Sequence, residues 1–171
     1  MNLEYKHLLD PGFDPMSRVW IYQSNRLFSL NEALEIENIL REFQTQWQSH
    51  GDEVKNEIHL FFGQFLVFIA DESSTKVGGC STDSSVRVVK EIEKKYGVSL
   101  LDRQMLAFLI NDKIQVLPMA QVPYAMEQGF IQTGTIYFNN LVATKKELEE
   151  NWMIPVSQSW LATKFPAIIS A

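Results

Sequence analysis

The residue types best suited to chemistry gather in one stretch, ADESSTKVGGCSTDSSVR, at positions 70–87. Two glycines let the backbone approach a partner closely, and several hydroxyl side chains can donate hydrogen bonds. A helical pattern follows, and the first turn of a helix offers free amides and a positive partial charge that favour an anion. We therefore expect a ligand site, with an anion as one ligand class. The candidate residues are Asp71, Glu72, Gly78, Gly79, Cys80, Ser81, Thr82, Asp83 and Ser84.

A structural interpretation of the same stretch is the main alternative. Thr82 or Asp83 has the right side chain to cap the helix that follows, and the two glycines then only form a turn. The carboxylate of Asp83 also argues against an anion, because it would repel one. The stretch is not an ATPase phosphate loop, since its only lysine, Lys76, precedes the glycines instead of following them.

Cys80 is the single cysteine and suggests a second chemistry. A thiol near a helix N-terminus is stabilised as the nucleophilic thiolate, and His50 or His59 could serve as its base. The spacing from Cys80 to Arg87 is one residue too long for the C-x5-R pattern of tyrosine phosphatases. Cys80 is therefore only a weak candidate catalytic residue.

Composition narrows the classes of partner. The formal net charge of -6 disfavours nucleic acid, whose phosphates are bound mainly by Lys and Arg. The longest apolar run, LFFGQFLVFIA, is too short to span a membrane, and one cysteine cannot form an internal disulfide. The three histidines lack the spacing of a zinc site. We expect a cytoplasmic protein without metal, cofactor, nucleic-acid partner or membrane partner.

Alternating and helical patterns predict the elements that must position these residues. A strand at 18–23 carries Val19 and Ile21 on one face and Trp20 and Tyr22 on the other. A helix follows at 29–48 and opens with the capping-box spacing of a serine and a glutamate. Two hairpins at 57–71 and 105–118 flank a second helix that ends at a glycine, position 97.

The predicted order, β-α-β-β-α-β with one extra strand, indicates an α+β fold with a ferredoxin-like core, in which two helices cover one face of an antiparallel sheet. We expect a single domain over 1–171. It comprises an N-terminal arm (1–17), the core (18–118) and a C-terminal α/β elaboration (119–171) that packs on the core. In this arrangement Gln23, Asn25, Arg26 and Arg103 lie at the opposite end from the loop at 71–85.

Three segments resemble an uncharacterised family of small bacterial proteins of about this length: VWIYQSNR (19–26), FQTQWQSHG (43–51) and DESSTKVGGCSTDSSVRVVKEIEKKYGVSLLDR (71–103). The resemblance covers most of the chain and is clearest over 18–118. Some family members carry the label of ABC-transporter ATPases, but this chain lacks the phosphate loop of such enzymes. The resemblance implies no activity, ligand or catalytic residue.

The sequence thus leads to three hypotheses about function. The first is a non-catalytic module that binds a small ligand or a protein partner through the Gly/Ser-rich loop. The second is a cysteine-dependent enzyme with Cys80 as its nucleophile. The third is a structural subunit that forms a homodimer.

Overall fold

The computed structural model describes residues 1–49 and 51–166, except for the side chain of Cys80. The strands are β1 (Arg18–Gln23), β2 (Gln48–Ser49), β3 (Asp52–Glu53), β4 (Lys55–Phe61), β5 (Phe65–Asp71), β6 (Met105–Ile110), β7 (Lys113–Pro118), β8 (Ile136–Phe138) and β9 (Met153–Pro155). The α-helices are α1 (Leu30–Gln46), α2 (Gly79–Tyr96), α3 (Val122–Glu127), α4 (Lys145–Asn151) and α5 (Trp160–Lys164). None of the helices among these residues is long and apolar enough to cross a membrane.

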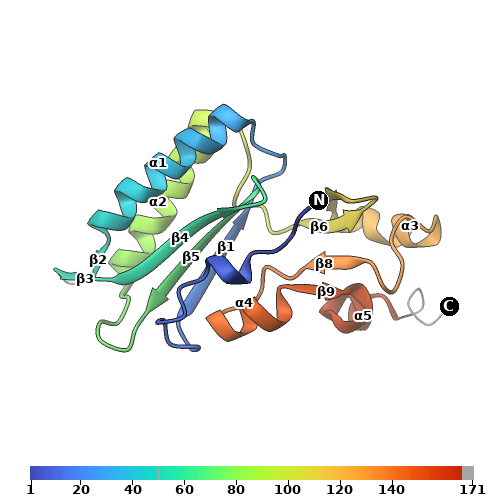
Figure 1. Cartoon of the computed structure of the whole chain (residues 1–171). Coiled ribbons are helices and arrows are strands. Elements are labelled where there is room, and N and C mark those ends of the chain that lie inside the picture. Colours follow the sequence, from blue (N-terminus) through green and yellow to red (C-terminus); the bar gives the residue numbers. More distant parts are fainter. Residues whose placement is uncertain (50, 167–171) are drawn as a thin grey trace.

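The first layer is an antiparallel three-stranded sheet in the order β1-β5-β4, with α1 and α2 side by side on one face (Figure 1). The alternation predicted for β1 is confirmed. Trp20 and Tyr22 pack on the helical side, whereas Val19 and Ile21 belong to the core on the opposite side. Every residue of the central strand β5 is buried, as its continuous apolar run indicates.

The face of this sheet that the helices leave open is covered from both ends of the chain. Tyr5 of the N-terminal arm and Trp152, which follows α4, lie 4.9 Å apart between ring centroids. Both belong to the core that contains Phe65 and Val67 of β5. The phenol of Tyr5 donates to the carbonyl of Leu148 at 2.5 Å, so the arm is fixed to the C-terminal part of the chain.

The second sheet has the order β7-β6-β8-β9, and its strands pair antiparallel. One of its faces adds Ala107 and Phe138 to the core just described. The other adds Phe108 and Tyr137 to a separate core shared with α3 and α5. The fold is therefore α+β, with two larger sheets, a small two-stranded sheet of β2 and β3, and helices outside the sheets.

The ferredoxin-like topology is not confirmed by this strand order. In that topology β6 would lie beside β1, but β6 is hydrogen-bonded to β7 and β8 in its own sheet. The physical reason is that β8 reaches back to pair with β6, with Phe108 opposite Tyr137, and so occupies the edge that β1 would need. The outer edge of β1 consequently faces the second sheet across a gap.

The ends of both long helices are set by local chemistry. Ser29 and Glu32 form the predicted capping box at the start of α1, and Gly97 ends α2 in the left-handed conformation. The prediction that Thr82 or Asp83 caps α2 is wrong. The helix begins earlier, at Gly79, and the carbonyl of Gly78 accepts from the amide of Thr82 at 3.2 Å.

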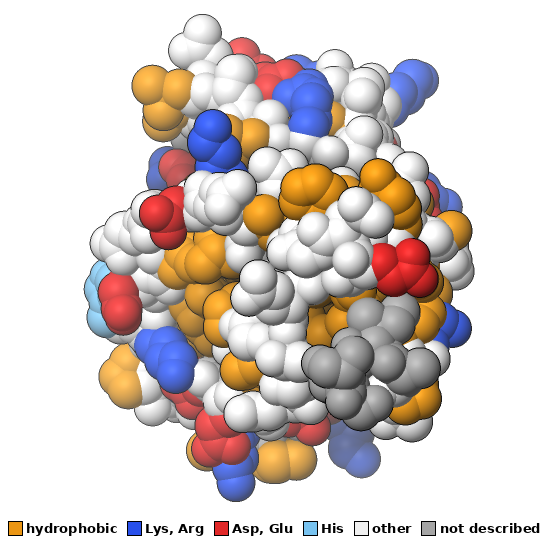
Figure 2. Space-filling model, turned by 90° about the vertical axis from the view of Figure 1, so that its right-hand side faces the viewer, with side chains coloured by type: hydrophobic (Ala, Val, Ile, Leu, Met, Phe, Trp, Pro, Cys, Tyr) orange, Lys and Arg blue, Asp and Glu red, His pale blue; other side chains and the backbone are white. Residues whose placement is uncertain are grey.

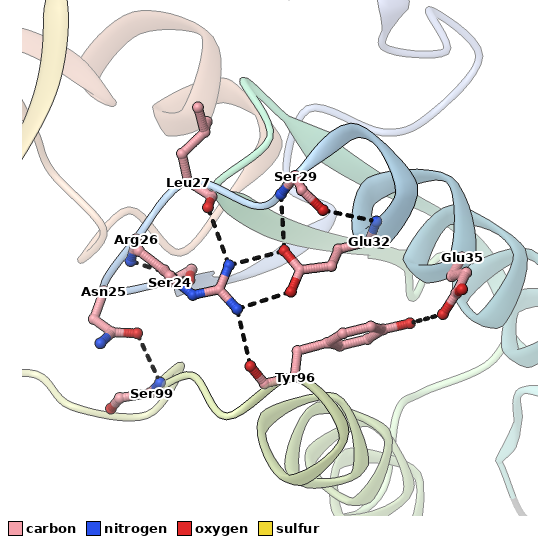
Figure 3. Close-up of polar contacts among 9 residues, drawn as sticks. All are labelled: Ser24, Asn25, Arg26, Leu27, Ser29, Glu32, Glu35, Tyr96 and Ser99. Carbon is pink, nitrogen blue, oxygen red and sulfur yellow. Dashed lines mark hydrogen bonds and ion pairs between the residues drawn. The ribbon is translucent and has the colours of Figure 1, made fainter.

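A polar cluster joins the two helices and the chain after β1 (Figure 3). The guanidinium of Arg26 donates to both carboxylate oxygens of Glu32 and to the carbonyl of Tyr96, at 2.8 to 2.9 Å. A cation at that carbonyl also complements the negative end of α2. Arg26 therefore has a structural role, at the end of α2 away from the loop at 71–85, as the sequence predicts.

Candidate functional site

The two predicted acids at the end of β5 are engaged within the protein. Asp71 accepts hydrogen bonds from Ser73 and Asp14 and forms a 3.1 Å ion pair with Lys55. Those hydrogen bonds, chiefly with Ser73, hold the pKa of Asp71 well below its usual range. Glu72 accepts from Arg18 at 3.2 Å and from the amide of Val77 at 2.9 Å. Both carboxylates thus have internal hydrogen-bond partners, and Asp71 is ionised at neutral pH.

The hydroxyl groups at the start of α2 also have internal partners. Ser81 is buried, and its hydroxyl donates to the carbonyl of Gln48 at 2.7 Å, while Thr82 donates to the carbonyl of Gly78 at 3.3 Å. The hydroxyl of Ser49 accepts from the amide of Gly78 at 3.2 Å. These hydrogen bonds therefore connect the start of α2 to the small β2–β3 hairpin.

The other residues of the predicted site add no converging group. Gly78 and Gly79 lie at the helix start, Gly78 with an extended backbone (φ -81°), and Asp83 is exposed. Ser84 has a partner within the protein. Three clefts in the described part of the chain are lined by other residues. A ligand at this loop stays a prediction.

The geometry also bears on the bases proposed for Cys80. Cys80 lies in the first turn of α2, and its side chain is outside the described residues, as is His50. The imidazole of His59 stacks on Phe61 at 4.8 Å, on the sheet face opposite the helices. His59 is therefore separated from α2 by the sheet, and nucleophilic catalysis by Cys80 stays a prediction.

Among the described residues, no three His, Cys, Asp or Glu side chains gather in a way that could hold a metal ion.

A cleft of about 370 Å³ lies between β1 and the second sheet. This volume lies within the range of about 300–1,000 Å³ that small-ligand pockets occupy. We call it the β1 cleft. It is lined by residues 18–23, 100–103, 105–106, 137–138, 140–143 and 160.

One wall of the β1 cleft is the outer edge of β1 itself. The amide of Val19 donates away from β5, to the carbonyl of Ala143 at 2.9 Å. Successive residues of a strand point their backbone N–H and C=O groups to opposite sides. The backbone groups of Trp20 and Tyr22 therefore pair with β5, and those of Ile21 and Gln23 face the cleft. Within the described residues, the N–H and C=O groups of Ile21 have no hydrogen-bond partner.

The two ends of this edge are closed in different ways. At one end the backbone pairs as a strand would, since Lys145 donates to the carbonyl of Ser17 at 2.8 Å. At the other end a side chain bridges the gap. The carboxamide of Gln23 donates to the carbonyl of Met105 at 3.3 Å and accepts from Asn140 at 2.9 Å. Between these ends the edge is open.

The walls of the cleft are aromatic and aliphatic. The indole N–H of Trp160 donates to the phenol of Tyr137 at 3.0 Å, which fixes one wall. Trp20 and Tyr22 lie on the β1 side, and burial, above all, raises the pKa of the Tyr22 phenol. An apolar ligand body would therefore be in contact with ring faces and edges on both sides.

Two arginines give the cleft a positive charge. Arg18 forms an ion pair with Glu72, and its guanidinium carbon lies 4.7 Å from the centre of the Trp20 ring. Arg103 is exposed and forms no ion pair within the described part of the chain. Its only acidic neighbour along the cleft lining is Asp102. Among the described residues, Arg103 is thus a cation without an ion pair beside the aromatic and aliphatic walls of the cleft.

Gln23 and Arg103 were predicted to lie at the same end of the fold but not in a site, and Asn140 was not predicted at all. Gln23 and Asn140 are 117 positions apart. The signal that was available is the uncharged segment from Val19 to Gln23, which differs from the charged alternation of β4.

Exposed aromatic side chains also occur outside the lining of the β1 cleft. Figure 2 views the side of the molecule that carries α3 and α5, and hydrophobic side chains gather towards its middle with charged ones mostly around the border. Tyr124 of α3 and Phe130 just after it are 62% and 60% exposed. This surface is compatible with a homodimer, which stays a prediction.

Comparison with protein-family models, with curated proteins and with solved structures gives no match for this chain.

Proposed function

We propose that this protein is a non-catalytic binding module whose ligand occupies the β1 cleft. The observation that carries the proposal is the combination, around one cavity, of an open strand edge, aromatic walls and the cation of Arg103, which forms no ion pair among the described residues. Ligand sites are typically apolar cavities with a few polar groups that fix orientation. The ligand is expected to have an apolar body and a negatively charged group.

We further infer that the core is a ferredoxin-like sandwich opened beside β1. The order of elements up to α2 and the position of both helices on one face support this interpretation. The slot that the fourth strand occupies in a closed ferredoxin-like sheet then corresponds to the β1 cleft. This relation explains why the cleft has a main-chain edge as one of its walls.

The proposal can be tested with small aromatic and aliphatic carboxylates, namely phenylacetate, indoleacetate and hexanoate, each paired with its uncharged amide. Binding is followed by the ¹⁵N-edited NMR signals of the Trp20 and Trp160 indoles, which lie on the cleft walls. We expect saturable shifts at these signals, larger for a carboxylate than for its amide.

Charge reversal at Arg103 provides the matched comparison. Arg103→Glu should weaken carboxylate binding about tenfold, because it replaces attraction by repulsion at a half-solvated site. Arg87→Glu, at an exposed position of α2 outside the cleft, makes the same charge change and should have no effect. Equal losses in both variants, or shifts confined to other surfaces, would contradict the proposal.

A further inference from the structure

We propose that the natural occupant of the β1 cleft is an extended peptide segment of a partner protein, bound as an added strand on the outer edge of β1. This inference rests on the proposed function and names its ligand class. Addition of a strand to an open sheet edge takes its affinity from main-chain hydrogen bonds and its specificity from side-chain pockets.

The first support is the set of unpaired backbone groups. The N–H and C=O of Ile21 point into the cleft and have no partner within the described residues. An extended peptide presents one acceptor and one donor at the same spacing, so both groups of Ile21 can be satisfied by one residue of the ligand. A compact organic anion has no such donor–acceptor pair.

The second support is that this edge already accepts a strand. Residues 143–145 pair antiparallel with residues 17–19 through two main-chain hydrogen bonds, of 2.9 and 2.8 Å. Past Val19 this pairing stops, and the side chain of Gln23 bridges to Met105 in place of a strand. The backbone of β1 is therefore in a conformation that supports pairing where the cleft is open.

The third support comes from a comparison of the two edges of the first sheet. An exposed edge is commonly protected from pairing by charged side chains. The other edge strand, β4, carries Lys55, Glu57 and His59. Between Val19 and Gln23 the edge of β1 carries no charge at all. This edge is instead surrounded by the walls of the β1 cleft.

The charges define the chemistry of the segment. Arg103 and Arg18 lie along the lining of one cleft, and Arg103 has no ion-pair partner within the described residues. We therefore assign the ligand as an extended peptide with apolar side chains and at least one acidic residue. The acidic residue would pair with Arg103.

The test uses a phage-displayed library of random heptapeptides, selected on the wild-type protein, and synthetic copies of the enriched sequences. Amide hydrogen exchange is then measured by NMR with and without peptide. We expect enrichment of acidic, apolar sequences, and exchange at Ile21 and Gln23 slowed at least tenfold by saturating peptide. Peptide binding without slower exchange at Ile21 overturns the strand geometry.

A pair of variants at one position separates backbone from side chain. Ile21→Pro removes the N–H that points into the cleft and leaves the β1–β5 ladder intact, because proline is tolerated where the missing donor faces outward. Ile21→Ala removes the side chain and keeps the N–H. We expect binding by Ile21→Pro to be about tenfold weaker than by Ile21→Ala. Equal affinities overturn the proposal.

Failure of this inference can be distinguished from failure of the proposed function. If small carboxylates bind in the cleft and no peptide is selected, the cleft is a ligand site and the strand proposal is wrong. If neither carboxylates nor peptides bind there, both proposals are wrong. The exchange measurement needs only the wild-type protein, so the test holds even if Ile21→Pro fails to fold.

Discussion

The guanidinium of Arg26 faces the carboxylate of Glu32 with two parallel hydrogen bonds, both 2.8 Å long. Glu32 also accepts from the amide of Ser29, so one carboxylate closes the capping box of α1 and holds the arginine that contacts the end of α2. This geometry gives lysine no equivalent role, because an ammonium cannot donate in two parallel directions. The pair joins the first turn of α1 to the carbonyl of Tyr96, the last residue of α2.

The first prediction concerns acid stability. The hydrogen bond from Arg26, above all, lowers the pKa of Glu32 from 4.5 to about 2 in the folded protein. A carboxyl group with a lowered folded pKa stabilises the fold above its unfolded pKa, and this contribution is lost as the pH falls from about 4.5 to about 2. Urea unfolding of Glu32→Gln should therefore depend less on pH in this window than wild type.

Glu42→Gln is the control for this experiment, since Glu42 is exposed on the same helix and lies outside the Arg26 cluster. Its difference from wild type should stay constant across the window. Arg26→Lys should behave like Glu32→Gln and lower the urea midpoint at neutral pH. Parallel pH profiles for wild type and Glu32→Gln would show that the pair contributes nothing to stability.

The second prediction concerns Ser81. Its buried hydroxyl satisfies the carbonyl of Gln48, and removal leaves that carbonyl without its donor. Ser81→Ala should cost about 1–2 kcal/mol in the free energy of unfolding. Ser74→Ala, an exposed serine of the same loop, should be neutral. Denaturant unfolding at neutral pH measures both.

A comparison of wild type with Ser81→Ala also tests the hypothesis that the loop binds an anion. If the hydroxyl of Ser81 is purely structural, phosphate should change the melting temperature of wild type and Ser81→Ala equally. A phosphate-induced rise that is lost only in Ser81→Ala would instead support a ligand site at positions 71–84.

The third prediction concerns the free edge of β1. In the unliganded protein the amides of Ile21 and Gln23 should exchange with solvent at least tenfold faster than those of Trp20 and Tyr22, which are paired with β5. Amide exchange followed by NMR gives all four rates in one experiment. Equal protection along the strand would mean that the outer edge is occupied.

The fourth prediction concerns the N-terminal arm. Tyr5→Phe removes the hydrogen bond to Leu148 and leaves a buried carbonyl unpaired, at a cost of about 1–2 kcal/mol. Leu8→Ala, at an exposed arm position, should change stability little. Thermal or urea unfolding compares the two.

Tyr5 also predicts an alkaline limit. Burial is the main cause that raises the pKa of its phenol above the ordinary value of 10.0. The unfolded chain therefore loses this proton at a lower pH than the folded protein. The contribution of the neutral Tyr5 phenol to the free energy of unfolding is lost progressively as the pH rises above about 10. Tyr5→Phe should reduce this alkaline loss, although the buried phenols of Tyr22 and Tyr137 contribute in the same direction.

Local patterns were the part of the fold that could be predicted from the sequence. The Ser29–Glu32 spacing gave the start of α1, and the alternation from Val19 to Tyr22 gave the two faces of β1. These features depend on residues close together in the chain, whose side-chain chemistry is sufficient to set them.

Features that depend on distant partners could not be predicted. The strand at 105–110 has the same apolar pattern whether it pairs with β1 or with β8, so the pattern does not encode its neighbour. Likewise, the hydroxyl of Ser81 looked free for a ligand because its acceptor, the carbonyl of Gln48, is 33 positions earlier. The start of α2 was predicted too late for a different, local reason. Its N-cap residue is Gly78, which has no side chain that would mark it as a cap.

The covering of β5 by the two ends of the chain has a consequence for biosynthesis. Tyr5 leaves the ribosome more than a hundred residues before its acceptor, Leu148, and its ring neighbour, Trp152. Until then the apolar face that contains Phe65, Val67 and Ile69 lacks its contacts with Leu148 and Trp152. A nascent chain that has extended only to α2 therefore exposes an apolar strand surface that favours aggregation.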